Sequence, residues 1–257
     1  MDLDRLGSNW DAWGRQDAMY AVLTDPAKRH NGWDADAFFA TGREEIAGVF
    51  DYLHGLGIVP ARQAALDFGC GVGRLSQALA DHFDSVVGLD IAPSMIRQAN
   101  EHNRFGDRVR YLVNARDDLS VVASQSIDFV YCNIVLQHMR PDYALAYVRD
   151  FFRVLRPGGV AVFFLPEAVA AAPVAVSVKA RVKELVRRTV NAVSYGVRGS
   201  TVLPGIDMFG TARSTVESAV RSAGGVVRDV VADPSAGDGW TGYRYCCQPS
   251  ASAGDAA

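Results

Sequence analysis

Between residues 64 and 165, short apolar runs alternate with segments in which apolar residues recur every three to four positions. Runs of about five such residues predict buried strands, and the three-to-four spacing predicts helices with one apolar face. Strands and helices that alternate in this way are typical of a mainly parallel sheet covered by helices. Five strands are predicted here, at 64–68, 85–89, 108–113, 127–132 and 160–165.

The segments between and after these strands complete the predicted fold. Helical spacing follows the first and fourth strands, at Leu75, Leu79 and Phe83 and at Tyr147, Phe151, Val154 and Leu155. Pro157-Gly158-Gly159 predicts a sharp turn into the fifth strand, because proline and glycine do not continue a helix. Further helices are predicted at 44–56 and 215–223, and two closing strands at 226–231 and 242–247.

We therefore predict a doubly wound α/β fold, with a mainly parallel seven-stranded sheet, helices on both faces and a small helical cap. The expected segments are an N-terminal helical lid (1–57), a cofactor-binding Rossmann-like core (58–166), the cap (167–206), a C-terminal helix and strands that complete the core (207–248) and a flexible tail (249–257). In the cap, apolar residues alternate with lysines and arginines, which predicts an amphipathic basic helix. That helix is expected either to contact an anionic acceptor or a membrane surface weakly, or to be a solvated face.

Composition narrows the classes of partner. Of 257 residues, 49% are hydrophobic and the formal net charge is -3, which predicts a globular protein that does not bind nucleic acid. The four cysteines lack paired metal-ligand spacing and no secretory signal precedes the polar start, so we predict no metal site and a cytoplasmic location. No apolar stretch approaches the ~20 residues of a transmembrane helix. We expect a monomer or a homodimer.

Three alternating glycines, Gly69, Gly71 and Gly73, lie between the first predicted strand and its helix, just after Asp67. Glycine permits both unusual backbone torsions and the close approach of a ligand. The second predicted strand is followed by Asp90, close to the ~20-residue offset at which an acid binds ribose hydroxyls. Together these features predict an adenosyl ligand across the strand ends, where open α/β sheets bind ligands.

A dinucleotide is the nearest alternative ligand. Its G-x-G-x-x-G fingerprint needs glycine or alanine at the last position, where this chain has Arg74. Asp67 would repel a pyrophosphate, whereas it can accept a hydrogen bond from a cationic amino-acid head group. A nicotinamide-dependent oxidoreductase is therefore disfavoured.

The acid followed by G-x-G-x-G resembles the first motif of the class I S-adenosylmethionine-dependent methyltransferases, and the resemblance runs from about Phe39 to Tyr245. It implies that S-adenosylmethionine is the cofactor and S-adenosylhomocysteine its product. It also implies the cofactor-binding residues, which are Asp67, Gly69, Cys70 and Gly71 at the methionyl part, Asp90 at the ribose, and Ile91 and Met95 at the adenine.

The third motif of that family usually supplies an aspartate beside the adenine amino group. Here an alanine, Ala115, occupies that position. We expect the backbone of Ala115 and Arg116 to contact adenine, and Asp117 or Asn114 to substitute for the acid.

The fourth motif is matched up to Asn133 and in the Leu136-Gln137-His138-Met139 stretch that follows, which the resemblance implies lies beside the methyl group. His138 is our candidate catalytic base, because imidazole titrates near neutral pH. The alternative hypothesis is a histidine that only shapes this loop through backbone hydrogen bonds.

Three other features are candidates for the site. Arg43 is expected to pair with the cofactor carboxylate, with a solvated charge at a helix start as the alternative. Trp10, Trp13 and Trp33 are interpreted as an aromatic lid or as packing anchors. The 207–210 segment is expected to line the acceptor pocket.

The resulting prediction is a methyltransferase that acts on a small-molecule acceptor, with a hydroxyl of a sugar or secondary metabolite as the favoured target. The chain lacks an Asn/Asp-Pro-Pro-Tyr tetrad after the fourth strand, which disfavours enzymes that methylate nucleobase or glutamine amino groups. Methylation of nitrogen or carbon on a small molecule stays open. A catalytically silent S-adenosylmethionine-binding subunit or regulator also stays open.

Overall fold

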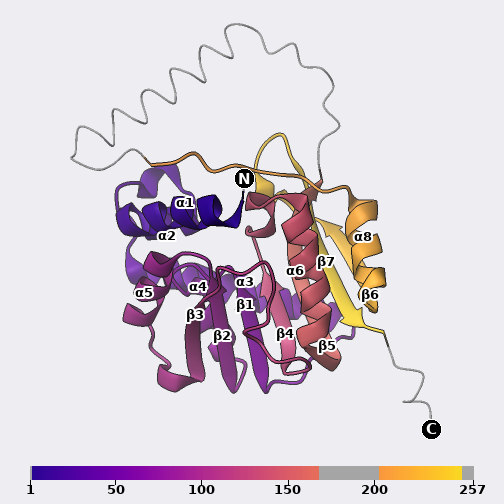
Figure 1. The fold of residues 1–257 in the computed structure, drawn as a ribbon. Helices are drawn as coiled ribbons and strands as arrows, with labels where there is room; N and C mark the ends of the chain where they lie inside the picture. Colours follow the sequence, from indigo (N-terminus) through magenta and orange to yellow (C-terminus); the bar gives the residue numbers. More distant parts are fainter. Residues whose placement is uncertain (1, 168–202, 251–257) are drawn as a thin grey trace, which may run out of the picture.

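The structure, a computed structural model, describes residues 2–167 and 203–250. Its centre is a seven-stranded sheet in the order β3-β2-β1-β4-β5-β7-β6, so the predicted seven strands are confirmed (Figure 1). The strands are β1 (Ala64–Phe68), β2 (Ser85–Asp90), β3 (Val109–Val113), β4 (Ile127–Cys132), β5 (Leu155–Glu167), β6 (Gly225–Ala232) and β7 (Thr241–Pro249). The order reverses between β1 and β4, which places a topological switch point beside the glycine turn.

The sheet is parallel from β3 to β5 and antiparallel at its other edge. β1 pairs in parallel with β2 and with β4, and β3 and β5 extend this arrangement on either side. β7 is antiparallel to both β5 and β6, because the short 233–240 connection folds it back onto β6. The predicted mainly parallel sheet is therefore confirmed, with one antiparallel strand between β5 and β6.

β5 begins five residues earlier than predicted. Leu155 already pairs with Ile127, and the register shifts before Val160 pairs with Phe129. Gly158, with φ +77°, lies within this irregular start. The predicted turn at Pro157-Gly158-Gly159 is thus a bulge inside the strand, because a strand bends at such a glycine and resumes pairing.

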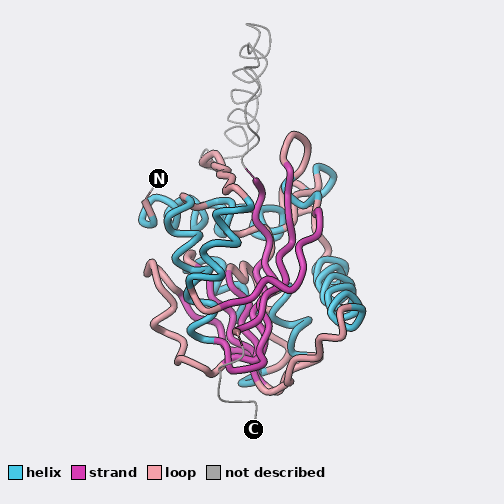
Figure 2. The backbone as a smooth tube through the Cα atoms, turned by 90° about the vertical axis from the view of Figure 1, so that its right-hand side faces the viewer, coloured by secondary structure: helices cyan, strands magenta, loops and turns pink. Residues whose placement is uncertain are grey.

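Helices cover both faces of the sheet, as predicted (Figure 2). Neighbouring residues of a strand face opposite sides, so Ala65 and Leu66 belong to different apolar clusters. One face packs on α6 (Pro141–Val154) and α8 (Arg213–Ser222). The other face packs on α3 (Ala35–Gly55), α4 (Arg74–Ala80) and α5 (Pro93–Glu101). Two residues predicted to be helical lie just beyond these helices, namely Phe83 after α4 and Leu155 after α6.

The N-terminal region is more helical than predicted. α1 (Leu3–Gln16) and α2 (Ala18–Val22) precede α3, which begins at Ala35 rather than near residue 44. The Asp34 side chain accepts a hydrogen bond from the Ala37 N–H and so begins α3. α1 and α2 lie across the upper side of the sheet in Figure 1, beside α5.

Two predicted segments fall at the ends of the described ranges. The basic cap helix lies in 168–202, outside the described residues. The predicted flexible tail begins too early, since Pro249 belongs to β7 and the Ser250 N–H donates to the Gly224 carbonyl at 2.7 Å. None of the described helices is both long and apolar enough to cross a bilayer.

Candidate functional site

A cavity of about 640 Å³ opens at the carboxyl ends of β1, β2 and β4 and extends beneath α1 and α2. That volume is typical of a small-molecule site. Several residues named from the sequence line it together, namely Gly69, Cys70, Gly71, Asp90, Ile91, Met95, Asn133 and His138. The structure therefore brings the glycine turn, the acid after β2 and the loop after β4 to one cavity.

The turn after β1 depends on glycine. Gly69 has φ +78° and Gly71 has φ +53°, in the region that favours residues without a Cβ. A Cβ at Gly69 would lie 2.2 Å from Val135 Cγ2. The N–H groups of Gly69 and Cys70 both donate to the Leu89 carbonyl, at 2.8 and 2.9 Å, which ties the turn to the end of β2.

Asp90 lies next to this turn. Its carboxylate accepts hydrogen bonds from the N–H groups of Gly71 and Ala92, both at 2.9 Å. Burial raises the pKa of Asp90, and these backbone bonds oppose that rise. Each carboxylate oxygen keeps a second lone pair, so the group can also accept bonds from a diol in the cavity.

Asp67 does not line the cavity. It is buried, and its carboxyl accepts a hydrogen bond from the Ser76 hydroxyl at 2.6 Å. Burial raises the pKa of Asp67 to about 7, while Ser76 and the Arg74 cation act in the opposite direction. The structure therefore does not place this side chain at a ligand head group, because its strand position faces α4.

At the end of β3, Asn114 lines the cavity, whereas the neighbouring residues do not. Ala115 and Arg116, named from the family motif, are exposed and do not line the cavity. Asn114 is buried and lines it, and its Oδ1 has no hydrogen-bond partner among the described residues. The Asn114 Nδ2 group donates to the Asp118 carbonyl at 3.0 Å, which fixes the orientation of the amide.

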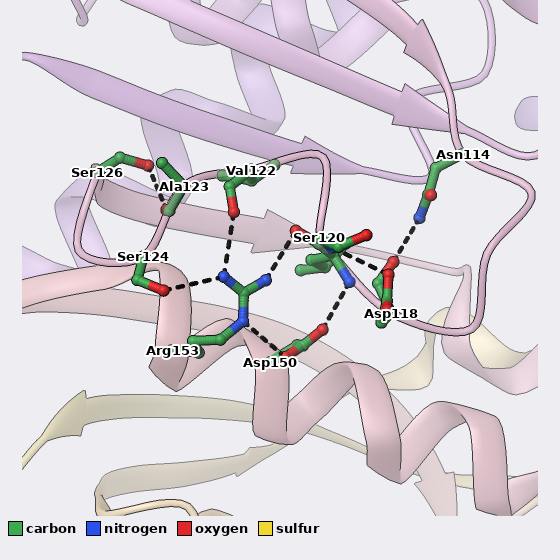
Figure 3. A network of polar contacts seen from close by, with 10 residues as sticks. Asn114, Asp118, Ser120, Val122, Ala123, Ser124, Ser126, Asp150 and Arg153 are labelled. Carbon is green, nitrogen blue, oxygen red and sulfur yellow. Dashed lines mark hydrogen bonds and ion pairs between the residues drawn. The ribbon is translucent and has the colours of Figure 1, made fainter.

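A polar network holds this β3–β4 connection against α6 (Figure 3). The Arg153 guanidinium donates to the carbonyls of Leu119 and Val122, at 2.7 and 3.1 Å, and to the Asp150 carboxylate at 3.0 Å. Asp150 in turn accepts the Leu119 N–H at 2.6 Å. Since Asp118 adjoins this anchored segment, the network supports the position of Asn114.

Arg43 is exposed on α3 and does not line the cavity. Arg74 lines the cavity instead; it is buried, pairs with Glu45 at 2.8 Å, and its Nε has no partner among the described residues. Glu45 also accepts hydrogen bonds from Tyr131 at 2.8 Å and Asn133 at 2.7 Å. The position of Arg74 directly after the third glycine was the sequence signal that could have identified it as a site residue. In the sequence analysis Arg74 was used only to disfavour a dinucleotide ligand.

His138 lies in the 3-10 turn Leu136–His138 that follows β4. Its Nδ1 is 3.0 Å from the Asp207 carbonyl, and the Trp10 ring packs edge-on at 5.2 Å between centroids. Burial lowers the pKa of His138, and the carbonyl partially opposes that effect. In the neutral ring Nδ1 must then donate its hydrogen to the carbonyl, which leaves Nε2 as an acceptor.

Sequence analysis missed most of the residues opposite the glycine turn. They share no local motif and come from α1, the turn after α2, the loop after β4, the segment before α8 and the β6–β7 connection: Leu3, Leu6, Leu23, Thr24, Ile134, Val135, Ile206, Ser235, Ala236 and Gly237. Gln137 and Met208, from two stretches that were named from the sequence, also line the cavity. Of the three candidate lid tryptophans, Trp10 lines this cavity, whereas Trp13 and Trp33 donate hydrogen bonds to the carbonyls of Pro204 and Leu23. No cluster of three or more metal-ligand side chains occurs within 2–167 and 203–250.

Residues 65–159 match the family model described as a methyltransferase domain, and this range holds the glycine turn, Asp90, Asn133 and His138. Residues 65–159 therefore form a domain of the class I S-adenosylmethionine-dependent methyltransferase type. The methyltransferase domain predicted from the sequence is thereby confirmed for this range, and with it S-adenosylmethionine as the cofactor of that family.

Two similar curated proteins are named ubiquinone biosynthesis O-methyltransferase. The one from Xanthomonas axonopodis pv. citri (strain 306) is 37% identical over 101 residues, 39% of this chain and 41% of the relative. The one from Xanthomonas euvesicatoria pv. vesicatoria (strain 85-10) is 30% identical over 151 residues, 58% of this chain and 52% of the relative. The match thus spans about half the length of these relatives or less.

Solved structures share the fold at low sequence identity. Magnesium protoporphyrin IX methyltransferase from Synechocystis PCC 6803 with bound SAH has a TM-score of 0.61 at 17% identity, covering 97% of this chain and 100% of that one. A putative sarcosine dimethylglycine methyltransferase from Galdieria sulphuraria has a TM-score of 0.58 at 17% identity, covering 96% and 98%.

The polar atoms of the cavity fit the cofactor. Four buried atoms in its wall have no partner among the described residues: Arg74 Nε, Asn114 Oδ1, Asn133 Oδ1 and Gln137 Oε1. Buried polar groups are normally hydrogen-bonded, so these atoms indicate a polar ligand. S-adenosylmethionine carries a carboxylate that suits the Arg74 donor, and an ammonium group and an adenine amino group that suit amide oxygens.

Proposed function

We propose that this chain transfers the methyl group of S-adenosylmethionine to a hydroxyl oxygen of a small, largely apolar acceptor. When bound, S-adenosylmethionine supplies an electrophilic methyl group on a sulfonium centre. The observation that carries the proposal is the His138 imidazole, whose Nδ1 is held by a carbonyl and whose Nε2 is left to accept a proton in the cavity that contains the glycine turn and Asp90.

We call the part of the cavity formed by the glycine turn, Asp90 and Asn114 the donor end, and the part around His138 the acceptor end. At the donor end, each polar group of the cofactor has a candidate residue. Arg74 binds the carboxylate with its unpartnered Nε, and Asn133 accepts a hydrogen bond from the ammonium group. Asp90 accepts hydrogen bonds from the ribose hydroxyls, and Asn114 from the adenine amino group. Met95 packs beside the adenine. Asn114 is thus our choice among the substitutes for the missing acid of the third motif.

At the acceptor end, His138 takes the hydroxyl proton. S-adenosylmethionine would supply its methyl group to the acceptor oxygen and be released as S-adenosylhomocysteine, and His138 Nε2 would accept the proton that the hydroxyl loses. The lowered pKa keeps the imidazole neutral near pH 7 and therefore able to accept this proton.

The wall around His138 favours an apolar acceptor with a polar group beside its reacting hydroxyl. Trp10, Val135, Ile206 and Met208 present apolar surface, and Gln137 offers one buried amide. A sugar would leave most of its hydroxyls against apolar side chains, which costs free energy. The O-methyltransferase name of the two Xanthomonas relatives supports oxygen as the target.

A panel of phenolic and sugar acceptors with labelled S-adenosylmethionine tests the proposal. We expect methyl ether formation with a phenolic member, and His138→Ala to lower kcat by about 10²–10⁴-fold without a change in S-adenosylhomocysteine affinity. His54→Ala, at an exposed position of α3, is the control. Donor binding without turnover of any acceptor would favour the silent subunit, and methylated nitrogen or carbon in the product would contradict the oxygen target.

The cytoplasmic location, the absence of a nucleic-acid partner and the monomeric or homodimeric state stay predictions.

A further inference from the structure

The segment 204–211, which we call the clasp segment, carries the carbonyl that contacts His138. Three hydrogen bonds join it to the loop after β4 and to the end of β5. The Asp207 carbonyl meets His138 Nδ1 at 3.0 Å, the Phe209 N–H donates to the Gln137 carbonyl at 2.7 Å, and the Thr211 N–H donates to the Pro166 carbonyl at 2.9 Å. The clasp segment therefore lies along the loop after β4 and the end of β5.

Its first residue is held by α1. The Trp13 indole Nε1–H donates to the Pro204 carbonyl at 3.1 Å, across 191 residues of sequence. α1 is itself fixed on α5, because Ser94 donates to the Asp11 carboxylate through its N–H and to the Asp11 carbonyl through its hydroxyl, both at 2.8 Å. Trp13 thus joins the clasp segment to a helix anchored on the donor side of the cavity.

The state of His138 depends on this contact. In water, neutral imidazole favours the tautomer with its proton on Nε2, in which Nε2 cannot accept a proton from the acceptor. A carbonyl on Nδ1 reverses that preference, since it accepts a hydrogen bond only from a protonated Nδ1. The reactive tautomer therefore requires the Asp207 carbonyl to stay in place.

Resting on the proposed function, in which His138 is the base, we propose that Trp13 is a positioning residue for His138. Its indole N–H holds the Pro204 carbonyl, which keeps the Asp207 carbonyl on Nδ1 and so fixes the tautomer with Nε2 free. Asp207 and Ile206 are exposed, and among the described residues they lie between two hydrogen-bonded positions of the clasp segment, Pro204 on Trp13 and Phe209 on Gln137. Trp13 thereby acts on the base without touching the acceptor.

The test measures the tautomer of His138 by ¹⁵N NMR of the ring nitrogens in the S-adenosylhomocysteine-loaded full chain. We expect wild type to carry the hydrogen on Nδ1 and Trp13→Phe, which keeps an aromatic ring, to shift a large share of the population to the Nε2–H tautomer. With an acceptor, kcat of Trp13→Phe should fall by about 10-fold while KM for S-adenosylmethionine changes less than about 2-fold.

Trp33→Phe is the matched control. Trp33 also donates an indole N–H bond to a carbonyl at 3.1 Å, but that carbonyl belongs to Leu23, after α2, and not to the clasp segment. It should lower stability to a similar degree and leave the tautomer of His138 unchanged. Should Trp13→Phe not fold, Trp13→Met removes the same N–H with an adaptable apolar side chain.

Two results would overturn the inference: an Nε2–H tautomer in wild type, or an unchanged tautomer in the Trp13 variants. An unchanged tautomer in the Trp13 variants leaves the proposed function standing if His138→Ala still lowers kcat, whereas an Nε2–H tautomer in wild type would also remove His138 as the base. Absence of S-adenosylhomocysteine binding in wild type would instead remove the proposed function, which separates the two failures.

Discussion

The donor end and the acceptor end of the cavity are built from different kinds of sequence. At the donor end, Gly69, Asp90 and Asn114 each lie at or just after the carboxyl end of one of three neighbouring parallel strands. At the acceptor end, Trp10, His138 and Met208 come from a helix, a loop and a connecting segment far apart in the chain. Strand order alone thus assembles the first end, whereas tertiary packing assembles the second.

The two ends therefore place different requirements on their residues. The donor end requires specific backbone conformations, because its N–H groups and carbonyls hold one another at the strand ends. The acceptor end requires side chains of suitable shape, on elements that tertiary packing holds in position. Changes at the donor end should therefore affect binding and folding together, and changes at the acceptor end should affect turnover.

The largest expected effect is at the glycine turn. Gly69→Ala places a Cβ 2.2 Å from Val135 Cγ2 at a position with φ +78°. We expect it to lower the free energy of unfolding by about 2–4 kcal/mol, from backbone strain and overpacking. Because the displaced turn no longer fits the ligand, S-adenosylhomocysteine affinity should fall by about 100-fold or more in calorimetry.

Gly48→Ala is the control for this prediction. Gly48 lies in α3 and a Cβ there meets nothing within 4 Å, so alanine should raise stability by up to about 1 kcal/mol. Equal behaviour of the two variants would show that the donor end does not depend on the backbone of the turn.

A smaller effect is expected at Arg74. Arg74→Gln removes the cation assigned to the cofactor carboxylate, so S-adenosylhomocysteine affinity should fall by about 10- to 100-fold. Affinity for 5′-methylthioadenosine, which lacks the amino-acid part, should change little. Arg43→Gln, at the exposed arginine named from the sequence, should leave both affinities within about 2-fold. Loss of affinity in Arg43→Gln rather than Arg74→Gln would reverse the assignment.

The two ends also differ in how far the sequence could predict them. Each of the first four strands was predicted to within one residue at either end, since buried strands flanked by glycine, asparagine and aspartate carry strong local signals. α3 was predicted nine residues short, because Thr41 and Gly42 obscured a helix whose start is capped at Asp34. No local pattern could show that Trp10 or Ile206 meets His138, because those contacts depend on how α1 and the clasp segment pack.

Asp67 marks the limit of motif-based prediction at the donor end. The motif gave its position correctly, but strand alternation decides where its side chain points, and it points to Ser76. The carboxyl of Asp67 therefore contacts α4 rather than lining the cavity. Asp67→Asn should therefore change S-adenosylhomocysteine affinity less than Arg74→Gln does.

The smallest effect on ligand affinity is expected at Asp67, where the change appears instead in the pH dependence of stability. The pKa of Asp67 is about 7 in the folded protein against 3.8 for the free group. Between these values the folded state binds more protons at this group than the unfolded state, so its contribution to the free energy of unfolding falls as pH rises from about 4 to 7. In Asp67→Asn the free energy of unfolding has no such decrease, so the variant should gain stability relative to wild type across that window and keep a constant difference above pH 7.

Urea unfolding at several pH values measures this difference, with the exposed Asp81→Asn as control. Parallel curves for wild type and Asp67→Asn would mean that Asp67 is ionised in the folded protein, and would restore it as a charged group near the donor end.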